Sequence, residues 1–110
     1  MNTEDIISTE EFDNFIKTNE AAVVYFSTQE CNVCKILKPK LIELLENKFP
    51  LFSFAYIDCN NAKELAAQNS VFSVPTIIFY MQGKELFRKS RNINLTELEN
   101  ELERPYSFIV

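Results

Sequence analysis

Two cysteines separated by two residues are the side chains in this sequence best suited to chemistry. Cys31 and Cys34 lie in the stretch STQECNVCKILKP, residues 27–39, and Lys35 follows the second thiol directly. A pair at this spacing can exchange with a substrate disulfide, or it can supply two of the four ligands that a zinc ion needs. The surroundings of the pair decide between these chemistries.

The pair lies where a predicted strand gives way to a predicted helix. AAVVYFS, residues 21–27, is a short apolar run rich in β-branched and aromatic residues, which is typical of a strand buried on both faces. From Val33 to Lys48 apolar residues keep a helical period, and we expect Pro39 to kink this helix rather than end it.

The start of a helix is a favourable place for a reactive thiol. Its free backbone N–H groups and the positive end of the helix dipole stabilise an anion, so we expect a lowered pKa for Cys31. Cys34 lies one turn further along the same face and can attack a mixed disulfide held by Cys31. Redox exchange is therefore the favoured interpretation of the pair.

Two other interpretations stay open. Zinc would need further ligands, and the sequence offers only Cys59 as another thiol and no histidine, so a carboxylate or a second chain would have to contribute. Alternatively, the pair is inert. The sequence predicts no metal site and no dissociable cofactor.

The other predicted elements alternate strands and helices before ending in a hairpin. Beginning from the apolar pair Ile6-Ile7, the order is β-α-β-α-β-α, followed by two further strands and a closing helix. We expect about five strands in a mixed sheet flanked by about four helices, in one α/β domain over residues 1–110. Outside residues 21–48, the expected elements are a helix at 9–18 with a capping box at Ser8, a strand at 51–58, a helix capped by Asn61, strands at 74–81 and 84–90 joined by Gln82-Gly83, and a helix from Leu95 capped by Asn94 and stopped by Pro105.

Composition narrows the possible partners. The 110 residues carry a net charge of −5, and the basic residues are scattered among acidic ones, which argues against nucleic-acid binding. No segment has the length or apolarity of a membrane span, and the acidic N-terminal stretch does not resemble a secretory signal. We therefore expect a cytoplasmic protein, in which a close thiol pair is more often catalytic than a static cross-link.

At this point the sequence resembles the thioredoxin family over nearly its whole length. The features that carry the resemblance are Cys31-Asn-Val-Cys34 after the strand, Pro39 in the following helix, Val74-Pro75-Thr76 at a strand start, and Gly83 in the hairpin turn. The resemblance implies a thioredoxin-like fold and a cis peptide bond before Pro75. It also implies that Val74, Pro75 and Thr76 shape a groove for an extended substrate strand.

The sequence departs from the family pattern around the thiols. Glu30 stands where the family commonly has tryptophan; its carboxylate opposes a thiolate at Cys31, whereas Lys35 favours one. Tyr25 stands where thioredoxins usually carry a buried aspartate, and Phe54 falls at or near the usual lysine partner. We expect slower resolution by Cys34, with water, Tyr25 or Glu30 as proton acceptor.

Three further residues or segments stand outside the core motif. Arg91 lies near a family glycine. It is interpreted as a contact for an acidic substrate, as a cation that lowers the pKa of Cys31, or as a solvated loop cation. Cys59 is interpreted as a buried small apolar residue rather than a redox centre. The tail, residues 105–110, is expected to fold back on the core rather than offer an apolar patch to another chain.

The resemblance implies a specialised thiol-disulfide oxidoreductase. Its partners would be proteins bearing disulfides and an upstream reductant such as a thioredoxin reductase, and the protein itself is expected to be a monomer. The alternative is a thioredoxin-like binding module with little or no turnover.

Overall fold

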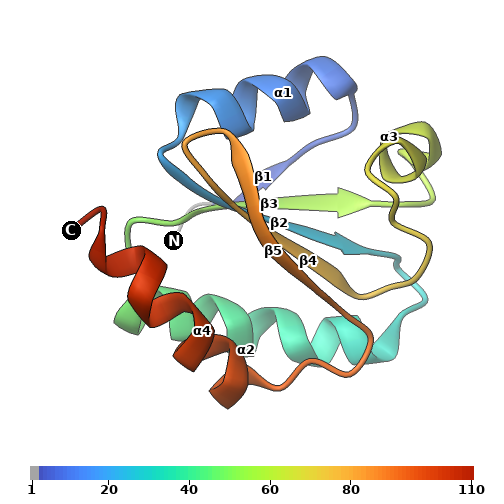
Figure 1. Cartoon of the computed structure of the whole chain (residues 1–110). Helices are drawn as coiled ribbons and strands as arrows, with labels where there is room; N and C mark the ends of the chain where they lie inside the picture. Colours follow the sequence, from blue (N-terminus) through green and yellow to red (C-terminus); the bar gives the residue numbers. More distant parts are fainter. Residues whose placement is uncertain (1–2) are drawn as a thin grey trace.

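The apolar run at residues 21–27 forms β2 (Ala21–Ser27), a strand in the interior of a five-stranded mixed sheet (Figure 1). The computed structural model describes residues 3–110; the expected domain, 1–110, begins with two residues outside the described range. The sheet order is β1-β3-β2-β4-β5, in which β3 is parallel to β1 and β2, whereas β4 is antiparallel to both of its neighbours. The remaining strands are β1 (Thr3–Asp5), β3 (Ser53–Asp58), β4 (Thr76–Met81) and β5 (Lys84–Ser90).

Helices cover both faces of this sheet, as expected. Helices α1 (Thr9–Thr18) and α3 (Lys63–Gln68) lie on one side, and α2 (Asn32–Lys48) and α4 (Leu95–Ser107) lie on the other (Figure 1). Helix α2 continues through Pro39, as predicted. No helix within residues 3–110 is long and apolar enough to cross a bilayer.

Strand β2 is buried on both faces because it contributes alternate residues to two hydrophobic cores. Ala21, Val23 and Tyr25 pack with leucines of α2 and α4. Ala22, Val24 and Phe26 instead pack with apolar residues of α1 and α3. The continuous apolar run in the sequence therefore indicates a strand in the interior of the sheet.

Two of the three predicted N-caps are confirmed. The side chains of Ser8 and Asn94 accept hydrogen bonds from the backbone N–H groups three residues later, 3.1 and 3.0 Å long. The third was wrong: the residue before α3 is Ala62, and the Asn61 amide contacts the Asp58 carboxylate at 3.4 Å instead.

The boundaries differ from the sequence interpretation at three strands and one helix. Strand β1 lies at Thr3–Asp5, before the apolar pair Ile6-Ile7. Strand β3 begins at Ser53 rather than at residue 51, and β4 begins at Thr76 rather than at residue 74. Pro105 does not stop α4, which runs on to Ser107. Proline removes only one N–H donor, and burial of the next side chain, Tyr106, holds the last turn in place.

The β4–β5 hairpin closes with the predicted two-residue turn. Met81 pairs with Lys84, and Gln82 and Gly83 between them both have positive φ, 53° and 79°. Two left-handed residues give the turn type whose twist matches a hairpin, which explains a glycine at this position.

Candidate active site

Loops that carry the predicted site residues leave the sheet at the same end. In the strand register Ser27 lies opposite Asp58, Phe26 opposite Thr76, and Thr76 opposite Ser90. Four segments therefore begin or end at one end of the strands: 28–31, 59–62, 73–75 and 91–94. This is the carboxyl end of the parallel strands, which is where ligands bind in open α/β sheets.

Cys31 and Cys34 form a disulfide at this edge, with their Cα atoms 5.3 Å apart. Cys31 is the N-cap of α2: its backbone is extended, and its sulfur accepts a hydrogen bond of 3.1 Å from the Cys34 N–H. Cys31 is partly exposed, whereas the Cys34 side chain is 1% exposed. The pair thus combines one accessible sulfur at a helix N-terminus with one sheltered sulfur a turn below.

Tyr25 lies directly beneath the pair in β2. Its side chain is buried, and its hydroxyl donates a hydrogen bond of 2.7 Å to the Cys34 carbonyl oxygen. Burial, with a smaller contribution from neighbouring Tyr56, raises the pKa of Tyr25 well above its ordinary value. A phenol that stays protonated and donates a hydrogen bond to a carbonyl oxygen is a positioning group, which argues against Tyr25 as the proton acceptor for Cys34.

Phe54, which the resemblance puts at or near the usual lysine partner, lies beside Tyr25. The two rings stack with centroids 6.0 Å apart, and both are buried. An aromatic stack therefore fills the position where the family usually has a carboxylate and a lysine, and each ring contributes apolar burial instead of an ion pair.

The segment before β4 has the geometry that the resemblance implies. The Val74–Pro75 peptide bond is cis, and the Pro75 carbonyl accepts a hydrogen bond of 2.9 Å from the Arg91 N–H. Thr76 is buried, and its hydroxyl bonds to the Ser73 carbonyl at 2.7 Å. Within residues 3–110, neither backbone polar group of Val74 has a hydrogen-bond partner, so both are free for an incoming strand.

Charged residues rim the thiols on different sides. The Glu30 carboxylate accepts a hydrogen bond of 2.9 Å from the Asn60 amide, which ties it to the loop after β3. Lys35 and Arg91 are both exposed. Arg91 has φ 63°, in the left-handed region that favours glycine, which accounts for the glycine that the family often has there.

Two neighbours of the site were missed in the sequence interpretation. The Lys38 ammonium lies 4.3 Å from the centre of the Tyr56 ring, and Tyr56 stacks on Tyr25. Lys38 is four residues after Cys34 and so shares its helix face, which is a signal the sequence contained. The contact with Tyr56 depends on strand pairing and could not be predicted from the sequence.

Cys59 follows β3 and stays a free thiol. It is partly buried against the core beneath α1 and α3, and its N–H donates to the Ser27 carbonyl. Burial first and the Asp58 carboxylate second raise the pKa of the Cys59 thiol. Across residues 3–110, no three His, Cys, Asp or Glu side chains gather in a way that could hold a metal ion.

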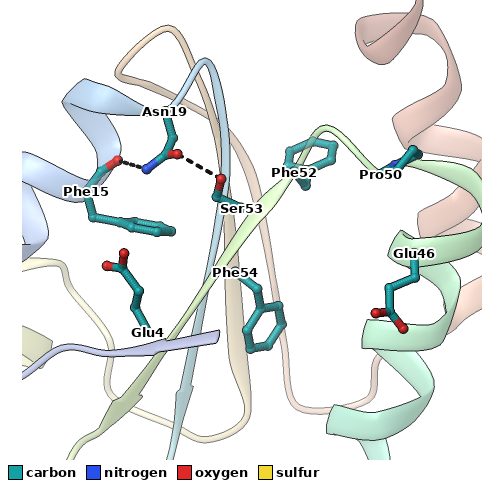
Figure 2. A pocket seen from close by; sticks show the side chains of 8 residues that line it. All are labelled: Glu4, Phe15, Asn19, Glu46, Pro50, Phe52, Ser53 and Phe54. Atoms are coloured by element: carbon teal, nitrogen blue, oxygen red, sulfur yellow. Dashed lines mark hydrogen bonds between the residues drawn. The ribbon is translucent and has the colours of Figure 1, made fainter. Parts of the chain in front are cut away.

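A cavity of about 450 Å³ lies at the other end of β3 and contains neither thiol. Figure 2 shows its lining, in which the Asn19 amide donates to the Phe15 carbonyl and accepts from the Ser53 hydroxyl. These bonds tie the end of α1 to the start of β3. The cavity thus lies beside a structural junction, away from the thiols.

The chain matches the family model for thioredoxin over residues 4–104. A thioredoxin-like protein of Bacillus subtilis, YdfQ, is 33% identical over 94 residues, covering 86% of this chain and 83% of that protein. A thioredoxin of Mycoplasmoides gallisepticum is 32% identical over 98 residues, covering 89% of this chain and 97% of that protein.

Solved structures agree with the sequence comparisons. The oxidised mitochondrial thioredoxin 3 of Saccharomyces cerevisiae has a TM-score of 0.82 at 26% identity, covering 92% of this chain and 93% of that chain. A thioredoxin of Trypanosoma brucei brucei has a TM-score of 0.81 at 26% identity, with coverages of 93% and 88%.

Proposed function

The chain belongs to the thioredoxin family of thiol-disulfide oxidoreductases, and from this premise we propose that it is a specialised reductant of protein disulfides. Its electrons reside in the Cys31–Cys34 pair, so the reaction needs no dissociable cofactor. The observation that carries the proposal is the accessible N-cap sulfur of Cys31 above the sheltered sulfur of Cys34.

Cys31 is the proposed nucleophile. In the reduced protein its thiolate attacks one sulfur of a substrate disulfide, forming a mixed disulfide and releasing the other substrate sulfur as a thiolate that takes up a proton. The helix N-terminus and the N–H of Cys34, which points at the Cys31 sulfur, favour the negative charge of the attacking form.

Cys34 is the proposed resolving thiol. It loses its proton, and the resulting thiolate attacks the Cys31 sulfur of the mixed disulfide. The Cys31–Cys34 bond forms, the bond between Cys31 and the substrate sulfur breaks, and that sulfur leaves as a thiolate that takes up a proton. No carboxylate stands at the Tyr25 position, and the nearby Glu30 carboxylate is bonded to Asn60, so we assign the proton to water. We expect this step to be slower than in a thioredoxin with the buried aspartate.

The segment at Val74, Pro75 and Thr76 is the proposed substrate groove. The free N–H and C=O of Val74 can pair with an extended substrate strand, as at an open sheet edge. Thr76 shapes the segment through its bond to Ser73 rather than by contacting substrate. Glu30, Lys35 and Arg91 modulate the electrostatics around Cys31.

The cellular setting forms part of the same proposal. The protein acts as a monomer in the cytoplasm, where an external reductant such as a thioredoxin reductase regenerates the dithiol. Equilibrating the protein with glutathione mixtures measures its reduction potential, which decides whether it donates electrons, accepts them or rearranges disulfides.

Insulin reduction with dithiothreitol as electron source tests the proposal. We expect the wild-type protein to accelerate insulin precipitation, Cys31→Ser to abolish the acceleration, and Cys34→Ser to accumulate mixed disulfides with substrate. Failure of the wild-type protein to accelerate would favour the alternative, a binding module without turnover, for which the tyrosine in place of a proton acceptor is the supporting observation. Equal activity in the two serine variants would remove the assignment of roles.

A further inference from the structure

A groove beside the disulfide lies between the first half of α2 and the segment 91–95, which leads into α4. It consists of two adjoining depressions of about 340 and 350 Å³ that share Val33, Leu37 and Ile93. Val33 lies between the two cysteines in the sequence, so the groove begins next to the pair, although neither cysteine lines it. Each depression has the size of a small ligand site and is large enough for a few side chains of a bound segment.

The floor and walls of this groove are mainly apolar. Val33 and Ile36 are 60% and 62% exposed, and Ile93 and Leu95 are partly exposed beside them. Four neighbouring aliphatic residues open to solvent next to a reactive pair form a surface suited to apolar side chains of a partner.

The charges along the groove are positive. Arg91 lines its start and Lys40 its far part, and no carboxylate is among the residues that line either depression. This stands out because the whole chain has a net charge of −5. Between residues 32 and 40, α2 carries three lysines and no acidic residue, and its first glutamate, Glu43, lies beyond the lining.

Three of the four glutamates of α4 form ion pairs with lysines outside the groove, and the fourth, Glu103, does not line it. Glu97 and Glu101 bind Lys89 of β5, at 3.7 and 2.8 Å, and Glu99 binds Lys48 at 3.2 Å near the end of α2. Lys40 has no ion pair within residues 3–110, and Arg91 has none either. Both cations are thus available to an acidic partner.

We propose that this groove binds an apolar, acidic segment next to the target disulfide of the substrate protein, and so selects substrates by charge. The inference rests on the proposed function. Lys40 is nine residues from Cys31, about 13 Å along a helix, which an extended chain spans in about four residues. The favoured substrates therefore carry an acidic residue about four positions from the reacting cysteine.

Activated peptides test this inference. Each peptide carries one cysteine as a mixed disulfide with 2-thiopyridine, and release of the thiopyridone gives the rate of attack by the reduced protein. Three matched peptides are compared. The first carries leucines and has acidic residues about four positions either side of the cysteine. The second has lysines in place of the acidic residues, and the third has serines in place of the leucines. A fourth peptide moves the acidic residues about eight positions away.

We expect the acidic leucine peptide to react about fivefold faster than the lysine peptide at low salt, since a few exposed charge pairs contribute on this scale. Salt, the leucine-to-serine change or the distant placement should each reduce that advantage. Lys40→Glu should lower the ratio of acidic to basic rates about fivefold. Lys17→Glu, a matched reversal on α1 on the opposite face of the sheet, should leave the ratio unchanged.

A ratio near one in the wild-type protein would overturn the inference, as would equal effects of Lys40→Glu and Lys17→Glu. Sedimentation velocity adds a further outcome: a dimer broken by Ile36→Asp would place a second copy in the groove and also overturn it. The small uncharged reagent 2,2′-dithiodipyridine keeps the two proposals apart. If the reduced protein fails to react even with this reagent, the proposed function fails; if it reacts but shows no charge preference, only the groove inference fails.

Discussion

The hydroxyl of Tyr25 donates a hydrogen bond of 2.7 Å to the carbonyl oxygen of Cys34, joining the sheet to the helix that carries the thiols. Both side chains are buried, and the raised pKa of Tyr25 keeps its proton on the phenol throughout the physiological range. The bond therefore holds the first turn of α2 at a fixed height above β2. This contact is specific to a chain with tyrosine at this position.

Removing that hydroxyl gives the first prediction. We expect Tyr25→Phe to lower the free energy of unfolding of the oxidised protein by about 1 kcal/mol, the usual contribution of a buried hydrogen bond. Urea unfolding measures this change. Tyr56→Phe is the matched control, because the Tyr56 hydroxyl has no hydrogen-bond partner within residues 3–110 while its ring keeps the stack. Equal losses in both variants would contradict a special role for the Tyr25 bond.

Restoring the family carboxylate gives the second prediction. In Tyr25→Asp the new carboxyl is buried against Phe54 without a cation, so its folded pKa rises above the unfolded value of about 4. Between these two pKa values the folded state keeps a proton that the unfolded state loses, so stability falls as pH rises through that window. We expect Tyr25→Asp to lower the free energy of unfolding relative to wild type, and to lower it more at roughly pH 8 than at roughly pH 5. Urea unfolding of the two proteins at each pH measures this difference.

A lysine at position 54 tests whether a cation stabilises the buried carboxylate of Tyr25→Asp. Adding Phe54→Lys to Tyr25→Asp should recover part of the stability lost at neutral pH, whereas Phe54→Lys alone should destabilise because it buries an unpaired charge. A stability difference between Tyr25→Asp and wild type that does not depend on pH would show that the new carboxyl is solvated rather than buried.

The parts of the fold that follow from local pattern were predictable from the sequence. The buried run at 21–27, the helical period after Val33 and the Gln82-Gly83 turn each determine their element from residues close together in the chain. The position of the first strand was not evident, because Thr3–Asp5 is exposed and polar and is a strand only through its pairing with β3.

The site was predictable where it lies in a motif and not where it depends on strand pairing. Cys31, Cys34 and Pro75 were identified from spacing and resemblance. The bonds Tyr25 to Cys34 and Glu30 to Asn60, and the position of Lys38 over Tyr56, join residues that only the tertiary structure brings together. The prediction that Pro105 stops α4 was wrong because it used only the local effect of proline. The burial of Tyr106 outweighs that effect, and it depends on contacts with residues distant in the sequence.

The third prediction concerns Cys59. In the oxidised protein it is the free thiol, and burial together with Asp58 raises its pKa. We expect iodoacetamide to modify Cys59 slowly at neutral pH, with a pH profile displaced to the alkaline side of an ordinary thiol, as measured by peptide mass spectrometry. Asp58→Asn should move the profile towards lower pH, since it removes the second cause of the shift. A profile at the ordinary thiol position in the wild-type protein would show that Cys59 is more open to solvent than the structure places it.

The final prediction concerns the end of α4, where only part of the tail folds back on the core as expected. Tyr106 is buried, its ring lies 5.0 Å from Phe49 and 5.9 Å from Phe52, and its hydroxyl accepts a hydrogen bond of 3.0 Å from the Leu51 N–H. Phe108, two residues later, is 75% exposed.

We therefore expect Tyr106→Phe to cost about 1 kcal/mol through the lost hydrogen bond, and Tyr106→Ala to cost about 3–5 kcal/mol through the cavity it leaves. Phe108→Ala is the control and should stay within about 0.5 kcal/mol of wild type, because an exposed ring loses little on truncation. Urea unfolding of the three variants ranks these effects. If Phe108→Ala destabilised as much as Tyr106→Ala, the tail would pack through Phe108, and the anchoring of α4 beyond Pro105 by Tyr106 would be wrong.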